Sequence, residues 1–263
     1  MSRGEPPKTG LSGRLVGIHP VLEALRAGSR SFERVYVVRG RGGKEFDEIL
    51  DRCRKGGIPF SVEPREVLDR LGGERHQGVV GIVSAKAYVP VEDLLRAAER
   101  RGEDPFLLIL SGVEDPRNLG AILRTAEGAG VHGVILPERR AAGLTETAAK
   151  TSAGALEHLP VARVGNIRQT VASLKQRGVW VMALDSRGET RYDRMDYKRP
   201  LAILIGGEDQ GLGPTILSEV DARLSIPLAG HVTSLNVSVA AGVMIFEVLR
   251  SRDFRKTEDN KKS

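Results

Sequence analysis

The pattern of apolar and polar positions changes partway along this chain of 263 residues. Over residues 14–86, short apolar runs such as VYVV and GVVGIV alternate with segments of helical periodicity such as GIHPVLEALRAG and KEFDEILDRCRK. This alternation predicts a small α/β domain. The Gly, Pro and Lys residues that dominate residues 1–13 predict a disordered arm before it.

From residue 106 onward the apolar runs are nearly continuous. They read FLLILSGV, GVILP, LPVARV, VWVMALD, LAILIG and ARLSIPL, with amphipathic helical segments between them. This pattern predicts a parallel sheet covered on both faces over residues 106–252. The charge-rich residues 87–105 predict a linker with a helical turn, and residues 253–263 a basic tail. Such sheets bind ligands beyond the carboxyl ends of their strands, so the loops after the apolar runs are the candidate functional segments.

The formal net charge of +6 is unevenly distributed along the chain. Residues 1–90 hold 16 Lys and Arg against 11 Asp and Glu, and residues 249–263 hold 6 against 3, whereas the middle holds 18 against 20. Positive ends attract a polyanion such as nucleic acid, because each neutralised phosphate releases counterions. Solvated helix faces would give the same counts, so charge admits an RNA partner without requiring one.

Several classes of site are excluded by missing signatures. The single cysteine, Cys53, allows no intramolecular disulfide and is interpreted as an incidental helix residue. No apolar leader or membrane-spanning run is present, which predicts a cytoplasmic protein with no membrane partner. G-x-G-x-x-G after the first strand of the sheet, a complete P-loop, H-E-x-x-H and G-x-S-x-G are all lacking, and the five histidines have no metal-ligand spacing. We therefore expect no metal.

The first candidate loop is EDPRNLGAILRTAEGAG, at residues 114–130. Asp115 suits a helix N-cap, which starts the helix near Arg117. Asn118 and Arg124 then lie toward its N-terminal end, where backbone N–H groups and arginines favour an anion. The alternative is an Arg124 that merely covers the helix surface.

The second candidate loop follows the run LAILIG. Gly206 and Gly207 carry no side chain, so the backbone there can approach a ligand closely, and Glu208 would lie at the mouth of the sheet. A tight turn with a solvated Glu208 is the alternative.

The third candidate loop precedes the long apolar segment NVSVAAGVMIFEVL. Ser234 and Asn236 lead into that helix and could simply cap it. The helix is apolar on nearly all sides, which predicts burial on both sides and hence a dimer interface.

Together and in this order, the three loops resemble the signature motifs of the SpoU (TrmH) family of RNA ribose 2′-O-methyltransferases, part of the SPOUT superfamily. The matching segments are NLGAILRTAEGAGV at 118–131, LIGGEDQGL at 204–212 and IPLAGHVTSLNVSVAAGVMIFEVLR at 226–250. GIHPVLEAL at 17–25 and HQGVVGIV at 76–83 resemble the family's substrate-binding domain. The resemblance implies a parallel-sheet domain with a deep trefoil knot, preceded by a small ribosomal-protein-like α/β domain.

The resemblance also implies the cofactor and the residues around it. S-adenosylmethionine would lie bent in the knot, held largely by backbone groups at Gly206, Ile226 and Leu235. No metal is implied. Arg124 takes the catalytic position, and the residues around it are Asn118, Glu208, Ser234 and Asn236. A guanidinium stays protonated and is a poor general base, so we interpret Arg124 as orienting an RNA phosphate and stabilising the developing alkoxide.

The implied substrate is structured RNA. Arg117, His76 and Gln77 are candidate RNA contacts, although a structural turn explains His76 and Gln77 equally well. Within the family, the two-domain layout is most similar to the enzyme that methylates a guanosine of 23S rRNA, and a homodimer through the knotted domain is expected. The alternatives are 2′-O-methylation of a transfer RNA, a non-catalytic RNA-binding or ribosome-assembly protein, and a nicotinamide-dependent oxidoreductase, which the missing glycine fingerprint disfavours.

Overall fold

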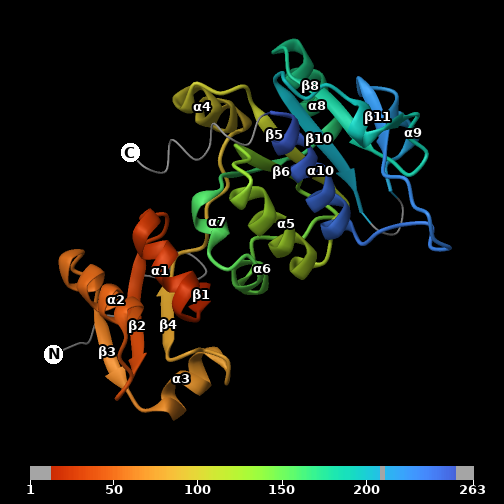
Figure 1. The fold of residues 1–263 in the computed structure, drawn as a ribbon. Helices are drawn as coiled ribbons and strands as arrows, with labels where there is room; N and C mark the ends of the chain where they lie inside the picture. Colours follow the sequence, from red (N-terminus) through yellow and green to blue (C-terminus); the bar gives the residue numbers. More distant parts are fainter. Residues whose placement is uncertain (1–12, 208–210, 253–263) are drawn as a thin grey trace. The chain divides into compact units, whose positions relative to one another are not determined.

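The computed structural model describes residues 13–207 and 211–252. Glu208, the predicted arm up to residue 12 and the predicted tail therefore lie outside the described residues. The chain forms two compact units (Figure 1), of which the first contains residues up to Ala87 together with Leu144–Glu157. The second contains Tyr88–Gly143 and the residues from His158 onward.

The first unit has a four-stranded sheet with the order β1-β4-β2-β3. β4 is antiparallel to both β1 and β2, whereas β2 and β3 are parallel. The elements are β1 (Gly13–Val16), α1 (Ile18–Ala27), β2 (Phe32–Val38), α2 (Lys44–Lys55), β3 (Phe60–Glu63), α3 (Arg65–Gly72) and β4 (Val79–Val83). The predicted alternation of strands and helices is confirmed, and β1 is an additional strand that the sequence pattern does not predict.

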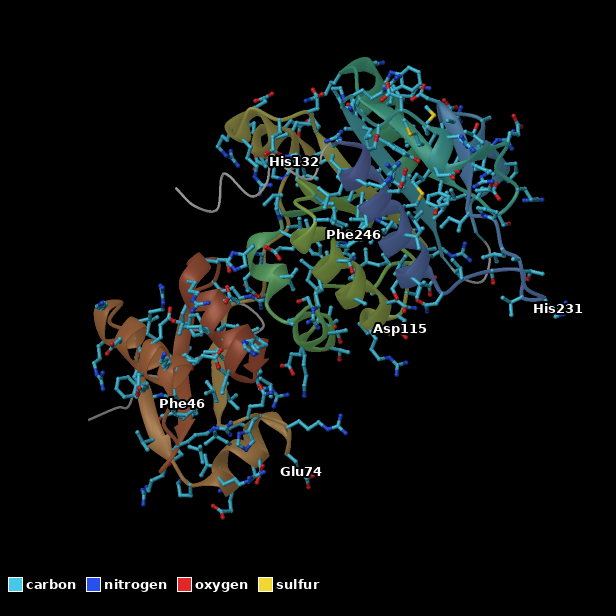
Figure 2. The ribbon with its side chains drawn as sticks, in the orientation of Figure 1. Phe46, Glu74, Asp115, His132, His231 and Phe246 are labelled. Carbon is cyan, nitrogen blue, oxygen red and sulfur yellow. The ribbon has the colours of Figure 1, made fainter. Side chains whose placement is uncertain are left out.

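Packing against this sheet explains the helices of the first unit. α1 ends at Gly28, which adopts the left-handed conformation with φ 58°. α2 buries Phe46, Ile49 and Cys53 on one face (Figure 2). Burial raises the pKa of the Cys53 thiol to about 11, which fits the interpretation of Cys53 as an incidental helix residue rather than a reactive thiol.

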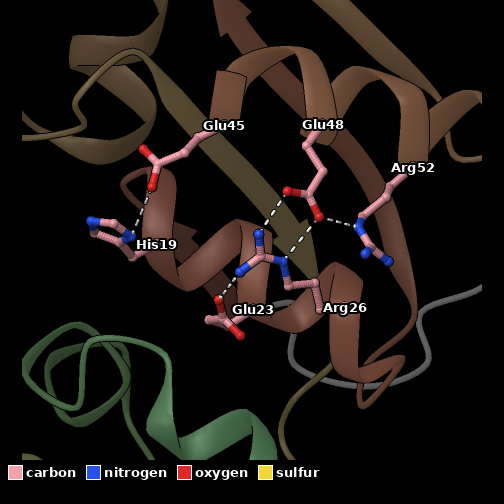
Figure 3. A network of polar contacts seen from close by, with 6 residues as sticks. All are labelled: His19, Glu23, Arg26, Glu45, Glu48 and Arg52. Atoms are coloured by element: carbon pink, nitrogen blue, oxygen red, sulfur yellow. Dashed lines mark hydrogen bonds and ion pairs between the residues drawn. The ribbon is translucent and has the colours of Figure 1, made fainter. Parts of the chain in front are cut away.

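Exposed ion pairs join α1 to α2 (Figure 3). Arg26 donates to Glu23 at 2.7 Å and to both carboxylate oxygens of Glu48, at 2.9 and 2.6 Å. Arg52 donates to the same Glu48 at 2.8 Å. These bonds lower the pKa of Glu48 to about 2, so its carboxylate stays charged over the whole physiological range.

The segment Leu144–Glu157 belongs to the first unit although it is remote from the rest of that unit in sequence. It contains α6 (Glu146–Thr151) and the start of α7 (Ala155–His158). The Glu157 carboxylate accepts hydrogen bonds from Ser29 at 2.6 Å and from Arg30 at 2.9 and 2.7 Å. The side chains of Arg30 and Glu157 are only 4% and 1% exposed. The sequence pattern predicts one continuous domain over 106–252, whereas the structure groups this segment with the first unit.

The second unit has a seven-stranded sheet with the order β7-β6-β5-β10-β8-β11-β9. All its pairings are parallel, which confirms the predicted parallel sheet. Its strands are β5 (Phe106–Ser111), β6 (Gly133–Pro137), β7 (Val161–Val164), β8 (Trp180–Leu184), β9 (Thr190–Arg191), β10 (Leu201–Gly206) and β11 (Ala222–Ser225). Its helices are α4 (Val91–Arg101), α5 (Pro116–Gly128), α8 (Ile167–Gln176), α9 (Pro214–Leu217) and α10 (Val237–Ser251), with a 3-10 turn at Tyr192–Arg194.

Both faces of this sheet are buried. α4 and α8 pack with Leu107 and Leu204 into one core cluster. The alternating strand residues, such as Leu108 and Ile203, are also fully buried and point to the opposite face. There α5 and α10 pack against each other (Figure 1). No helix among the described residues is both long and apolar enough to cross a membrane.

The prediction of a linker over residues 87–105 is wrong in its central part. Residues 91–101 form α4, a regular helix that ends at Gly102 in the left-handed conformation, φ 64°. Leu94 is fully buried, and a Cβ at Gly133 would lie only 2.5 Å from its side chain. The charged residues of α4 cover the solvent side of an amphipathic helix, so high charge content there does not mark a linker.

The buried ion pair between Arg30 and Glu157 allows a test of how the segment Leu144–Glu157 is held. Replacing Glu157→Ala leaves the Arg30 guanidinium buried without its partner, so we expect a loss of about 3–5 kcal/mol in the free energy of unfolding. Denaturant unfolding measures this loss. The double variant Arg30→Met, Glu157→Met should recover much of it. The control Arg54→Ala removes an exposed pair with Asp51 and should change stability far less; equal losses for both would contradict a special role for the buried pair.

Candidate functional site

A cavity of about 950 Å³ opens at the carboxyl ends of β8, β10 and β11. It is lined by Gly206 at the end of β10, Ile226 after β11, and Leu235 before α10. The structure thus brings together all three residues that the sequence resemblance assigns to cofactor binding. Ser234 and Asn236 line the same cavity, which places the second and third candidate loops at one site.

The chain packs against itself at the glycines of this site. β5 and β10 end in register, with Gly206 opposite Ser111, and the Gly207 N–H donates to the Ser111 carbonyl at 2.8 Å. A side chain at Gly207 would overlap the carbonyl oxygen of Gly112, and a Cβ at Gly206 would lie 2.7 Å from the backbone of Gly211. These glycines are expected from the sequence to allow close approach of a ligand; in the structure the chain's own backbone approaches them.

Two asparagines connect the first and third candidate loops. Asn236 is the N-cap of α10, and its Oδ1 accepts from the N–H groups of Ser238 at 2.9 Å and Val239 at 3.4 Å. Its Nδ2 donates to Oδ1 of Asn118 on α5 at 3.2 Å. The capping alternative considered for Asn236 is therefore correct, and the same side chain also ties α10 to α5.

A second cavity of about 510 Å³ is lined by Asn118. It shares Gly207, Gly211 and Val237 with the first cavity. Arg139 and Arg140, from the loop after β6, also line it. Two ligand-sized spaces therefore meet at Gly207 and Gly211, and the smaller one is lined by the carboxylates of Glu114 and Asp115 as well as by these arginines.

Arg124 lies outside these two cavities. It is exposed on α5, next to the fully buried Leu123, and it is not among the residues that line either space. It makes no hydrogen bond or ion pair with another described residue. The assignment of Arg124 as the catalytic residue stays a prediction, because within a single chain its side chain does not line either cavity.

Arg117 lies at the start of α5, beside Asp115, which is labelled in Figure 2. Asp115 caps the helix by accepting from the Arg117 N–H at 2.7 Å, as predicted. The Arg117 guanidinium also bonds to the Asp115 carboxylate, at 3.1 Å from Nη2, and this hydrogen bond holds the pKa of Asp115 below its ordinary value. The Arg117 side chain remains 77% exposed although its guanidinium is bonded to Asp115.

His76 and Gln77, the other two predicted RNA contacts, lie in the first unit. His76 is buried, its Nδ1 accepts from the Gly78 N–H at 2.8 Å, and its Nε2 lies 3.1 Å from the Asp69 carboxylate. The Gln77 Oε1 accepts from the Ile18 N–H at 3.3 Å, at the start of α1. Both side chains thus build the turn before β4, as the structural alternative proposes, while also lining a cavity of that unit.

Sequence reasoning missed one side of the larger cavity. Asp185 and Arg187, in the loop after β8, line it. The signal was present, because the polar segment DSRG follows the apolar run VWVMAL. It went unused because no side chain there forms a known motif. Among the described residues, no group of three or more His, Cys, Asp or Glu side chains could hold a metal ion.

Comparison with known proteins divides the chain into two parts, as the change in the pattern of apolar residues does. Residues 105–246 match the SpoU rRNA methylase family, and residues 14–89 match the substrate-binding domain of RNA 2′-O ribose methyltransferases. A Bacillus subtilis protein assigned to the TrmH family of tRNA/rRNA methyltransferases, YacO, is 42% identical over 239 residues, 91% of this chain and 96% of its own length.

Solved structures resemble the whole described fold. The SpoU methyltransferase AviRb from Streptomyces viridochromogenes, crystallised with AdoMet, has a TM-score of 0.76 and 26% identity, covering 92% of this chain and 90% of its own. The AdoMet-bound rRNA methyltransferase from Sinorhizobium meliloti has a TM-score of 0.73 and 29% identity, covering 91% and 87%.

The match of residues 105–246 to a methylase family and of residues 14–89 to a substrate-binding domain identifies the chain as an RNA methyltransferase. More narrowly, the chain belongs to the SpoU/TrmH family of RNA methyltransferases.

The glycine packing predicts a sharp difference between neighbouring positions of one loop. Gly207→Ala forces the loop after β10 away from Gly112, so we expect a loss of about 1–3 kcal/mol or more in stability and weaker ligand binding at the cavity. Gly213→Ala is the matched control, since a Cβ there meets nothing within 4 Å. Thermal unfolding compares the two. Similar melting temperatures would contradict the close approach of the two strand ends.

Proposed function

We propose that the chain transfers a methyl group from S-adenosylmethionine to a ribose 2′-hydroxyl of RNA. The observation that carries this proposal is the convergence of Gly206, Ile226 and Leu235 on one cavity in a member of the SpoU/TrmH family. These residues come from two loops separated in sequence. Relatives that share the fold are described with AdoMet bound, which supports the same donor here.

The residues present fit this donor. The volume of about 950 Å³ is within the range of roughly 300–1,000 Å³ for small-molecule sites. Apolar walls from Leu212 and Leu235 suit an adenine ring, and the glycine backbone at Gly206 and Gly207 suits recognition by main-chain groups. When bound, S-adenosylmethionine supplies an electrophilic methyl group that the ribose 2′-oxygen attacks in line. The knot implied by the family resemblance is part of the same proposal.

The chain's own residues then position the acceptor. Asn118 lines the smaller cavity and is bonded to Asn236, which lines the larger one, so this pair lies where acceptor and donor would meet. Arg124 and Arg117 carry permanent positive charge on α5. We assign them to the RNA phosphates, with Arg124 also stabilising the alkoxide while phosphate or water takes the hydroxyl proton. Glu208, which lies outside the described residues, is assigned to fixing Arg124 or the motif loops rather than to acting as the base.

As target we propose a guanosine of 23S rRNA, in the cytoplasm. The substrate-binding match over residues 14–89 supports an RNA substrate, and the similarity of the two-unit layout to the enzyme that methylates a guanosine of 23S rRNA is the reason for choosing this target. The test is to map 2′-O-methylated nucleotides in total RNA from cells with and without the gene. Loss of a methylated guanosine in 23S rRNA is the expected result. Loss of a methylated transfer-RNA site instead would show that the target is a transfer RNA. If no site is lost and the purified chain does not bind S-adenosylmethionine, the chain is a non-catalytic RNA-binding protein.

The role of Arg124 is open to a direct test. Arg124→Ala should lower the methyl-transfer rate by about 100-fold or more, because a charge that acts mainly in the transition state is lost. Affinity for S-adenosylmethionine, measured by calorimetry, should stay nearly unchanged, since Arg124 does not line the donor cavity. Arg100→Ala, on the exposed side of α4, is the control. Equal losses of donor affinity and of rate would overturn this role.

We also propose that the chain acts as a homodimer through α10. Val239 and Phe246 are 53% and 47% exposed and lie seven residues apart, so they share one face of the helix with the half-buried Val243. The opposite face, including Met244 and Val248, is buried in the unit. A second copy would cover this exposed stripe of α10. The helix α5, which carries Arg124, packs against α10 in the same chain.

Disrupting this stripe should separate the copies. Phe246→Glu places a charge in the proposed contact, so we expect a shift from dimer to monomer in analytical ultracentrifugation, together with loss of methyl transfer. Val62→Glu is the matched control, because Val62 is 48% exposed on β3 of the other unit. A wild-type chain that sediments as a monomer, or a Phe246→Glu variant that stays dimeric, would contradict this interface.

A further inference from the structure

The first unit holds a cavity of about 530 Å³ whose rim is strongly basic. Its cationic side chains are Arg41 after β2, Arg65 at the start of α3, Arg75 in the turn before β4, and Lys150 on α6. His19 also lines the cavity, and Glu74, labelled in Figure 2, is its acidic residue. Four separate segments of the chain thus direct positive charge to one concave surface.

Three of these cations keep their charge available. Arg41, Arg75 and Lys150 are exposed and make no hydrogen bond or ion pair with another described residue. Arg65 has only a loose contact with Asp69, at 3.8 Å. Some other arginines of this unit, such as Arg26, are instead bonded to carboxylates. An anion that binds at this rim reduces the electrostatic repulsion between its unneutralised cations.

The floor of the cavity is fixed by hydrogen bonds. His76 bonds to Gly78 and Asp69, and Gln77 bonds to Ile18, as described above. Gly78 has φ 87°, and a Cβ there would lie 2.8 Å from Cδ of Arg41. The stem of Arg41 therefore lies across Gly78. A preorganised floor reduces the entropy lost when a ligand is bound.

Lys150 reaches this cavity because the segment Leu144–Glu157 is fastened to the first unit. Glu146 accepts from the backbone N–H and the guanidinium of Arg14, both at 3.1 Å. Glu157 pairs with Arg30 at 2.7 Å, and Lys86 donates to the Glu157 carbonyl at 3.0 Å. Anchors therefore lie on both sides of Lys150 in sequence, so its place on the rim is set by the fold.

We propose that this basic cavity binds a backbone phosphate of the RNA substrate, and that Lys150 is one of its ligand-binding residues. This proposal rests on the proposed function for its choice of RNA. The lining contains no Phe, Tyr or Trp on which a base could stack, whereas it contains four cationic side chains, so phosphate is favoured over a base. The match to the substrate-binding domain ends at residue 89. The RNA-binding surface is thus completed by a residue from within the methylase match.

The test measures RNA affinity separately from methyl transfer. The full-length chain, without S-adenosylmethionine, is titrated against radiolabelled 23S rRNA and transfer-RNA transcripts in filter-binding assays at several salt concentrations. Lys150→Ala, Arg41→Ala and Arg75→Ala should each weaken binding about 3-fold or more and reduce the slope of log affinity against log salt by about 0.7–0.9. Lys150→Arg should restore both. Affinity for S-adenosylmethionine should not change.

Matched controls are Lys55→Ala and Arg34→Ala, exposed cations of the same unit that do not line the cavity. Both should bind RNA as the wild type does. The proposal is overturned if Lys150→Ala binds like Lys55→Ala, or if the wild type binds neither transcript. A wild-type chain that binds RNA through this cavity but transfers no methyl group would instead overturn the proposed function and leave the cavity in place.

Discussion

The ends of β5 and β10 lie so close together that the backbone of one occupies the space where the other would carry a side chain. The Gly207 N–H bonds to the Ser111 carbonyl at 2.8 Å, and Gly112 follows with φ 87°. This approach is possible only because two central parallel strands end in register. It brings the loops after both strands to one point, and both cavities of the second unit share that point as a wall.

A site built in this way has an unusual chemical character. Much of its surface around the glycines is main chain, and the polar side chains that border it, such as Asn236, are partly used in holding helices. Asn236 caps α10 and bonds to Asn118, so one amide adds a polar link to the packing of α10 against α5. Main-chain N–H and C=O groups can recognise a ligand without a charged fingerprint, and a site of this kind leaves little trace in the sequence.

The sequence pattern predicts helices and strands where the periodicity of apolar residues determines them. It fails where contacts between residues far apart in sequence determine the structure. The parallel strands were predictable because each is a run buried on both faces, as in β5 and β10. α4 was mistaken for a linker because its charged face dominates its composition, although Leu94 is buried. The position of the segment Leu144–Glu157 depends on Arg30, 127 residues away from Glu157, and no local pattern carries that information. The ordered loops predicted which residues would meet at the cavity, but not that Arg124 would stand apart from it.

The segment Leu144–Glu157 has a consequence for how such a protein can evolve. The chain passes between its two units at three places rather than at a single junction. Suppose that recombination exchanged only the first hundred residues. The retained part would then have Glu157 without Arg30, and the transferred part would have the basic cavity without Lys150. The unit that selects RNA and the unit that modifies it are therefore not independent modules, and a change of substrate is expected to arise by substitutions within both stretches of sequence rather than by domain exchange.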